Sequence, residues 1–467
     1  MKRRNILLGS AALVTAQTLG KFNVARAAAN LDPQRLTQDL TPLGAERAAS
    51  ASGHVPAWTG GVSTPPAGWS QGMFPPDLFT GQKPLFTVTA DNMSQYADML
   101  NDGQKLMFKT FGAAGFHINV FPSERTACAP QYVYDNTAKN IARAKAVDGG
   151  LTIGITGAFG GVPFPILSDD PTAAGAQAMW NHLTRWQGAF QSSLTAQYVV
   201  GNNTRTLTNA EQISIRQRYY DPSLAPEDFN GVLLEEYLEY TAPPTAVGGK
   251  FLVIDTLQPK QNPNRAYEYL VGEGRVRQLP QAEYDVPAPQ LGDAVNYDEA
   301  YLFQGAMDRY VWKLVGKKEM IIPYNQQTMM NTTPEDLLGL QFVNPDRVRY
   351  EIHRCWVVEA SLAPGARMTD PFRRFYIDED TWTVVAADLY DTQNNYWRYA
   401  ENILIAQPDL PGTIITGSVW YNFQEAKYVF AGTFFGTPYP IGGKAVGFAP
   451  IDASKFDPQS MANSGGL

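Results

Sequence analysis

The chain has 467 residues, which is enough for one large domain or for two to three ordinary ones. Hydrophobic residues make up 44 % of it and charged residues 18 %, a balance that excludes an intrinsically disordered chain. The formal net charge of −8 opposes general binding to nucleic acid or to an anionic membrane face, because both need a basic patch.

Residues 1–27 have the pattern of an export signal. Lys2–Arg4 form a basic start, an apolar stretch follows, and Ala25 and Ala27 occupy the small positions of a cleavage site. The order from Arg3 to Leu7 resembles a twin-arginine signal. We expect cleavage near Ala27/Ala28 and a periplasmic protein. Cleavage removes five of the 37 basic residues and none of the 45 acidic ones, so the mature net charge becomes −13.

Residues 28–90 are expected to form an irregular wrapping segment. Proline and glycine are dense in Gly53–Gly61 and Ser63–Trp69, which is typical of an extended, turn-rich chain. The tryptophans in these two stretches favour a segment that drapes over a core.

Residues 91–230 are expected to be mainly helical. The spacing predicts a helix capped by Asp91, a second over 104–111 and a third over 136–147. A fourth begins after Asp170-Pro171, since Asp caps a helix well and Pro suits its first position. It should run to about Phe190, with one apolar stripe that includes Met179, Trp180, Leu183 and Trp186. The stripe is either plain core or the lining of an apolar cavity.

The glycine-rich stretch GAFGGVPFPI (157–166) precedes that helix. A phosphate loop would need Gly-Lys-Ser/Thr at a helix start, and a dinucleotide fold would need G-x-G-x-x-G. Pro163 and Pro165 instead force an extended path around Phe164. We therefore predict no nucleotide site and no cofactor, and interpret the stretch as a stiff arm.

The hydrophobic period changes to two over residues 231–440, where short turns separate successive predicted strands, as in an antiparallel meander. Residues 441–467 are expected to form an irregular tail. The strands are predicted over 233–240, 250–257, 265–271, 275–279, 309–315, 319–324, 347–362, 373–377, 381–390, 396–406, 414–423 and 427–435. Helices followed by a long meander indicate the α+β class.

Alternation places Trp312, Tyr324 and Trp356 on apolar strand faces. Arg354 breaks the alternation by joining the same face as Trp356. A buried arginine needs either an internal acid or an anionic ligand such as a phosphate or carboxylate head group, and the sequence leaves both open.

Several stretches together resemble a family of exported Gram-negative proteins of unknown function, the outer-membrane lipoprotein-sorting-like domain of unknown function 1329. They are DLTPLGAERA (39–48), VPAWTGG (55–61), KPLFTVTADN (83–92), GGVPFPI with MWNHLTRW (160–186), RYVWKLVGKKEMIIPYN (309–325), RYEIHRCWVVEA (349–360) and FYIDEDTW (375–382). The family looks distantly related to the LolA/LolB lipoprotein carriers. The resemblance implies a curved antiparallel sheet, an open half-barrel, with helices on its concave side. It also implies envelope transport beside an outer-membrane barrel protein and an RND-type exporter, and it supplies no catalytic residues.

The chemistry-bearing residues do not form an enzyme signature. The four histidines are isolated, so we predict no metal site. The acidic run in YIDEDTW is best explained by a hairpin turn. Cys128 and Cys355 are candidates for a disulfide in an oxidising compartment, and two free buried thiols are the alternative.

We therefore expect a single domain over 28–467 that carries a lipid-like or other hydrophobic ligand, with a periplasmic hydrolase or an assembly factor for an outer-membrane barrel as alternatives. The predicted ligand-binding residues are Phe164, Met179, Trp180, Leu183, Trp186, Trp312, Tyr324, Arg354 and Trp356.

Overall fold

The computed structural model describes residues 31–70, 73–280, 284–443 and 446–462. The predicted signal peptide lies outside these residues. No helix in the described part of the chain is long and apolar enough to cross a membrane.

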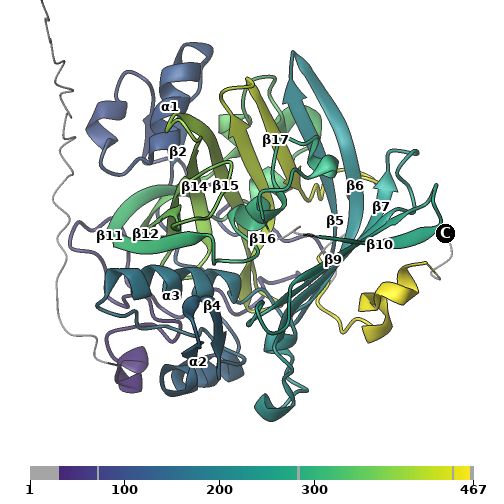
Figure 1. Ribbon diagram of the computed structural model, residues 1–467. Helices are drawn as coiled ribbons and strands as arrows, with labels where there is room; N and C mark the ends of the chain where they lie inside the picture. The colour runs from purple at the N-terminus through teal and green to yellow at the C-terminus, as the bar shows by residue number, and fades with distance from the viewer. Residues whose placement is uncertain (1–30, 71–72, 281–283, 444–445, 463–467) are drawn as a thin grey trace, which may run out of the picture.

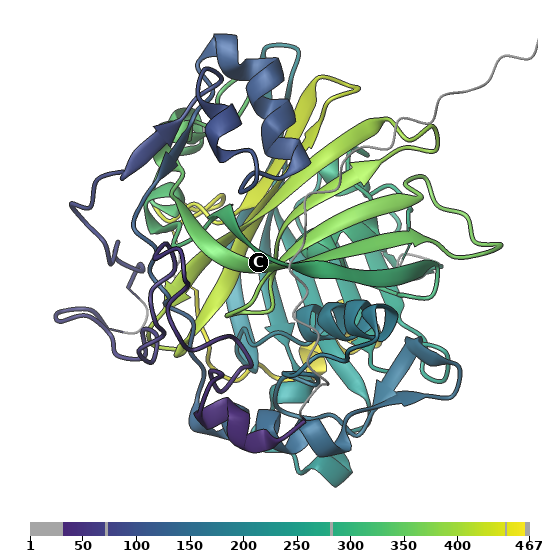
Figure 2. The ribbon, with the colours of Figure 1, turned by 90° about the vertical axis from the view of Figure 1, so that its left-hand side faces the viewer.

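One large curved sheet dominates the molecule (Figures 1 and 2), and its edges do not meet to close a barrel. Its strands are β1 (Phe86–Val88), β2 (Ile118–Val120), β5 (Phe190–Gly201), β6 (Thr204–Arg216), β7 (Val232–Ala242), β8 (Lys250–Thr256), β9 (Arg265–Leu270), β10 (Arg275–Leu279), β11 (Tyr310–Pro323), β12 (Tyr350–Leu362), β13 (Phe372–Asp378), β14 (Val384–Tyr390), β15 (Tyr396–Gln407), β16 (Gly412–Asn422) and β17 (Lys427–Gly432). A separate two-stranded ribbon joins β3 (Lys145–Val147) to β4 (Gly150–Thr156).

Two antiparallel meanders make up most of this sheet, and β1 and β2 extend it beyond β12, with β2 parallel to β12. Strands β11 to β17 are neighbours in chain order, as are β5 to β10, and most of their links are short, with longer links over 217–231 and 324–349. The pairing of β17 with β5, from Lys427↔Gly201 to Gly432↔Ala196, joins the two runs. The sheet therefore places strands that are far apart in the sequence side by side.

The presence of β5 and β6 corrects the expectation of a mainly helical region up to residue 230. Asn202 and Asn203 both have positive φ, at 50° and 58°, and turn the chain between the two strands. Asparagine tolerates this left-handed conformation, which tight hairpins require. On β5 the polar residues Ser193, Thr195 and Gln197 alternate with Leu194, Ala196 and Tyr198, a period of two that is typical of a strand and not of a helix.

The two strands predicted over 309–324 are one strand, β11. The predicted turn at Gly316–Lys318 is instead a bulge, at which the register against β12 shifts between Leu314 and Gly316.

The helices of the described chain are α1 (Asp102–Phe111), α2 (Gln131–Arg143), α3 (Pro171–Leu183), α4 (Gln327–Met330) and α5 (Pro334–Leu337). Single 3₁₀ turns lie at Pro33–Thr37, Met93–Tyr96, Gly112–Ala114, Arg218–Tyr220, Pro226–Asp228, Pro289–Leu291, Tyr297–Leu302, Pro345–Arg347, Ala453–Phe456 and Pro458–Met461.

Helix α3 starts as predicted, because the Asp170 carboxylate accepts a hydrogen bond from the Ala173 amide at 2.7 Å and Pro171 is the first helical residue. It ends at Leu183, so the predicted extension to Phe190 is wrong. Helix α3 packs against β11. Its place on the concave side of the sheet stays a prediction. The predicted Asp91 helix is only the Met93–Tyr96 turn, and α2 begins at Gln131 rather than Asn136.

The two ends of the described chain cover different parts of the sheet. Near the N-terminus, Leu43 and Val55 join the main core, and the Trp58 indole donates a hydrogen bond to the Ala127 carbonyl at 2.9 Å. Near the C-terminus, Phe456 and Met461 pack with apolar residues on one face of β7 and β8. The other face of β7 and β8 is therefore left to line a cavity.

Candidate functional site

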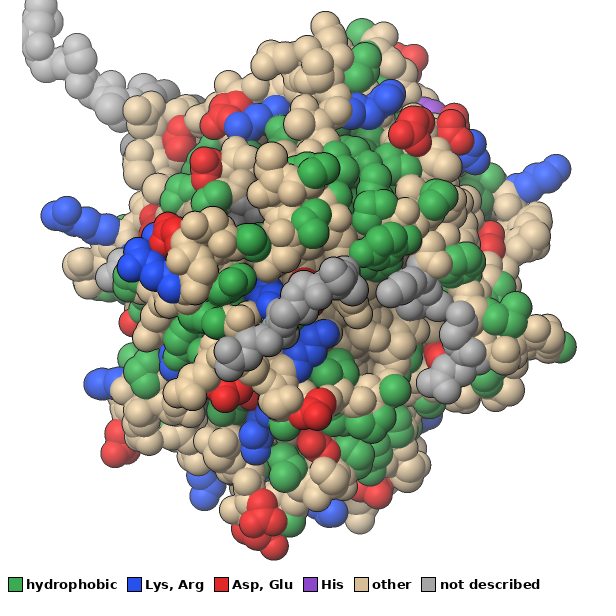
Figure 3. Space-filling model, turned by 90° about the vertical axis from the view of Figure 1, so that its right-hand side faces the viewer, with side chains coloured by type: hydrophobic (Ala, Val, Ile, Leu, Met, Phe, Trp, Pro, Cys, Tyr) green, Lys and Arg blue, Asp and Glu red, His purple; other side chains and the backbone are tan. Residues whose placement is uncertain are grey.

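A cavity of about 190 Å³ lies on that other face. Strands β5 to β9 line it together with Leu279 of β10, strands β16 and β17 and the segment 289–305. Figure 3 shows the surface on this side of the molecule, which is hollowed, with hydrophobic side chains gathered around the hollow. The apolar lining includes Ile213, Ile215, Leu238, Phe251, Val253, Leu291, Ile415 and Trp420.

Three carboxyl groups from neighbouring strands also line this cavity: Glu211 on β6, Glu236 on β7 and Asp255 on β8. They share one face because each strand pairs in register with the next and alternate residues point the same way. All three side chains are buried, and each accepts hydrogen bonds from neutral groups.

Glu211 has the most hydrogen-bond donors. It accepts from Thr195 Oγ1 at 3.3 Å, Gln197 Nε2 at 2.8 Å and Asn209 Nδ2 at 2.6 Å. Burial nevertheless raises the pKa of Glu211 to about 8, and the neighbouring Glu236 carboxyl adds to the rise.

The other two carboxyl groups are bonded to the segment 289–305. The Tyr301 hydroxyl donates to Glu236 at 2.8 Å, and the Gln304 amide donates to Asp255 at 2.6 Å. Burial raises the pKa of Glu236 to about 7 and that of Asp255 to about 6.

No described cation lies within ion-pair distance of any of these three carboxyl groups. Arg265 is the one basic residue in the described lining. Arg185 lies behind the lining, with its guanidinium 5.0 Å from the centre of the Tyr301 ring, and burial lowers the pKa of Arg185 to about 10. The cavity is therefore both apolar and acidic.

The ligand-binding residues predicted from the sequence do not line this cavity. Leu183 alone comes close, since it lines a small recess that shares Gln191, Ile215 and Asp255 with the cavity. Phe164, Met179, Trp180, Trp186, Trp312 and Tyr324 belong to the main core. Their polar atoms bond inward: the Trp180 indole donates to the Leu151 carbonyl at 2.7 Å, and that of Trp186 to the Pro411 carbonyl at 3.0 Å. Trp356 is half-buried, with Lys317 Nζ 4.7 Å from its ring centre.

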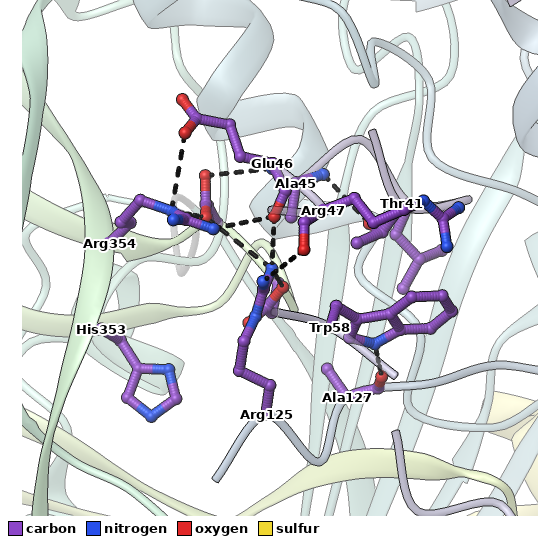
Figure 4. Close-up of polar contacts among 12 residues, drawn as sticks. Thr41, Ala45, Glu46, Arg47, Trp58, Arg125, Ala127, His353 and Arg354 are labelled. Atoms are coloured by element: carbon purple, nitrogen blue, oxygen red, sulfur yellow. Dashed lines mark hydrogen bonds and ion pairs between the residues drawn. The ribbon is translucent and has the colours of Figure 1, made fainter. Parts of the chain in front are cut away.

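Arg354 meets an internal acid, which is one of the two alternatives that the sequence left open. Its guanidinium pairs with Glu379 and donates to the Glu46 carbonyl at 2.8 Å. Figure 4 shows Arg354 and Arg125 pointing toward the same stretch of the N-terminal segment. The internal acid is therefore the correct alternative, because residues 46–48 and Glu379 supply all the acceptors.

His353 lies beside this ionic cluster and is the centre of the arrangement best suited to a metal. Its ring and the carboxylates of Asp378 and Asp380 place one ligand atom each within 4.8 Å of one another. His353 Nε2 lies 3.0 Å from Glu351. Burial opposes the charged imidazole, but the bond to Glu351 and nearby carboxylates outweigh it and raise the pKa of His353.

The charges around His353 favour an imidazolium over a metal. Five carboxylates, those of Glu46, Glu351, Asp378, Glu379 and Asp380, meet four basic groups, those of Arg125, Lys317, Arg349 and Arg354. A protonated His353 makes the two numbers equal. The cluster therefore locks the N-terminal segment to the sheet without needing a further cation.

The two cysteines are separate, so the candidate disulfide is not formed. Both are buried free thiols. Cys128 precedes α2 and its Sγ lies 3.1 Å from the Val62 carbonyl, whereas Cys355 lies inside β12 between Lys318 on β11 and Asp378 on β13.

Sequence reasoning missed the cavity residues for two reasons. Glu211 and the polar row on β5 lay in a region interpreted as helical. The alternation in β7 and β8 was recognised, but it does not say which face is covered by the C-terminal segment. The usable signal was that Glu236 alternates with Leu238, and Asp255 with Phe251 and Val253, so that each acid shares a strand face with apolar residues.

Comparison with known proteins gives consistent matches. Residues 87–462 match the model of the family described as "Protein of unknown function (DUF1329)". The chain is 35 % identical over 405 residues to uncharacterized protein PA3922 of Pseudomonas aeruginosa, covering 86 % of each chain.

Solved structures are more distant. A DUF1329 family protein from Desulfovibrio piger matches 56 % of this chain and 91 % of its own, with 12 % identity and a TM-score of 0.40. A domain described as an outer membrane lipoprotein-sorting protein, from Vibrio parahaemolyticus, matches 62 % and 98 %, with 10 % identity and a TM-score of 0.42. On the family match and the Pseudomonas relative, the chain belongs to the DUF1329 family.

Proposed function

We propose that the protein is a periplasmic carrier that binds a lipid-like or other hydrophobic molecule in the cavity of β5 to β9. The observation that carries the proposal is the cavity itself, which is lined by large apolar side chains within a sheet that does not close. Burying apolar ligand surface contributes about 25 cal/mol per Å², so burying about 300 Å² would contribute about 7 kcal/mol. That is enough to hold a ligand while it crosses water.

Apolar side chains predominate in the lining, which favours binding of a hydrophobic molecule. Its described residues include no histidine or cysteine, so the carboxyl groups of Glu211, Glu236 and Asp255 are the acid–base groups on which the hydrolase alternative would rest. The family resemblance adds the proposal that the carrier serves envelope transport, with an outer-membrane barrel protein and an RND-type exporter as partners.

The test fills the cavity and measures binding of a neutral fluorescent probe, N-phenyl-1-naphthylamine. Ile213 on β6 lines the cavity and Gln212 does not. We expect Ile213→Trp to weaken probe binding at least tenfold, because the larger ring occupies the ligand's place. The matched control Gln212→Trp should leave the affinity unchanged.

Native mass spectrometry of the protein from the periplasm, followed by solvent extraction, should reveal a bound hydrophobic molecule. Equal probe affinity in the two variants and the parent chain, with no extracted molecule, would contradict the carrier function.

A further inference from the structure

At the Glu211 end of the cavity, two side-chain carbonyl oxygens lack a hydrogen-bond donor among the described residues. The side-chain amides of Gln197 and Asn209 both turn their nitrogens to Glu211, at 2.8 Å and 2.6 Å. Their carbonyl oxygens consequently point away from it. Both oxygens are buried and have no hydrogen-bond partner among the described residues. Gln197, which is 6 % exposed, lines the cavity.

Buried acceptors of this kind call for a donor. A buried carbonyl oxygen without a partner costs free energy, and a buried carboxylate without a cation costs more. Among the described lining residues, three carboxyl groups, on Glu211, Glu236 and Asp255, are accompanied by one basic residue, Arg265. A ligand that brought its own positive charge and several N–H donors would satisfy the carboxylates and the Gln197 oxygen together.

We propose that the ligand of this cavity is a cationic amphiphile, with an ammonium head group that binds Glu211, Glu236 and the Gln197 carbonyl oxygen. Its apolar body contacts the side chains of Ile213, Leu238, Phe251 and Val253. The inference rests on the proposed carrier function and adds the chemical class of the ligand. An anionic lipid is disfavoured because its head group would meet three acids.

Three probes with the same ten-carbon chain separate the head-group classes: decylamine, decanol and decanoate. Each is titrated into the protein by calorimetry at pH 7.5, below its micelle concentration. We expect decylamine to bind at least tenfold more tightly than decanol, and decanoate to bind most weakly. The carboxyl groups are partly protonated at this pH, and a bound ammonium group favours their ionised form, so binding of decylamine should release protons. Repeating the titration in buffers of different ionisation enthalpy measures this proton release.

Two variants localise the head group. Glu211→Gln and Glu236→Gln should each weaken decylamine binding about tenfold and leave decanol binding within twofold, since each removes a carboxyl group that the ammonium group would ionise and keeps the shape. Glu239→Gln is the matched control, because Glu239 lies on the same strand as Glu236 and is outside the lining. Thermal unfolding of every variant checks that the fold is kept.

The outcomes distinguish this inference from the carrier function. If decanol or decanoate binds tightly and decylamine binds no more tightly, the proposal of a cationic ligand is wrong, whereas the proposed carrier function is still supported. If both Glu→Gln variants still bind decylamine more tightly than decanol by the same factor as the parent chain, the placement of the head group at Glu211 and Glu236 is wrong. Binding of none of the three probes overturns both proposals.

Discussion

The guanidinium group of Arg125 holds both carboxylate oxygens of Asp380, with Nε 2.8 Å from one oxygen and Nη2 2.6 Å from the other. The same group donates to the Glu46 carbonyl at 2.7 Å and to the Pro56 carbonyl at 3.2 Å. One buried side chain thus ties the loop before α2 and the turn after β13 to the N-terminal segment.

We expect Arg125→Met to lower the free energy of unfolding by about 3–5 kcal/mol, because it leaves the Asp380 carboxylate buried without its partner. Urea unfolding measures the change. The control is Arg275→Met, which breaks a pair whose arginine side chain is 67 % exposed, and it should change stability by less than about 0.5 kcal/mol. Similar losses in both variants would contradict the role of the buried pair.

The cavity acids should make stability fall as pH rises. The pKa of Glu211 is about 8 in the fold against 4.5 in the absence of the fold, so the folded chain holds this proton more tightly. Stability from this group is fully present below pH 4.5 and is lost as pH rises through 8. The free energy of unfolding of Glu211→Gln, relative to the parent chain, should therefore increase between pH 5 and pH 9. A difference that does not change with pH would refute this assignment.

Gly175 is expected to tolerate no side chain. A Cβ at this position would lie 2.6 Å from the backbone nitrogen of Lys313 on β11, so α3 would have to move away from the strand. Gly175→Ala should destabilise the protein by about 1–3 kcal/mol, although alanine favours a helix by about 1 kcal/mol. A stabilised Gly175→Ala variant, measured by thermal unfolding, would show that the contact between α3 and β11 is looser than described.

Trp180 and Trp186 should affect stability rather than ligand binding. Each is buried in the main core and bonded to a backbone carbonyl. We expect Trp180→Ala to cost about 3–5 kcal/mol of unfolding free energy and to leave probe affinity of the folded fraction unchanged. If a stable variant binds the probe more weakly, the apolar stripe of α3 contributes to the ligand site after all.

The two thiols should be free and unreactive in the folded protein. Burial raises the pKa of Cys128 to about 12, and that of Cys355 also rises through burial. A thiol reagent should label neither cysteine under native conditions and both after denaturation without reductant. Finding no free thiol in the denatured, unreduced protein would establish the disulfide instead.

Much of the fold could be predicted from local pattern. The alternation over β7 to β10 and β12 to β17 located those strands within a few residues, and Asp170-Pro171 marked the start of α3. These signals are local, because side-chain direction along a strand and capping at a helix start depend on neighbouring residues. At Gly316 the local pattern predicted a turn, but pairing with β12 on both sides of this residue keeps β11 continuous and leaves a bulge there.

Local sequence patterns specified an α+β chain with a long antiparallel meander, a resemblance to its family, and one arginine, Arg354, on an apolar strand face that needed a partner. The long-range pairing of the strands then fixed the partner of Arg354 and the surroundings of the other buried charges. Arg354 meets Glu379 and the backbone of residues 46–48, whereas Glu211, Glu236 and Asp255 meet a cavity. The reason is that β17 pairs with β5 and the C-terminal segment covers one face of β7 and β8. Both contacts join residues about 200 positions apart, a separation at which alternation carries no information.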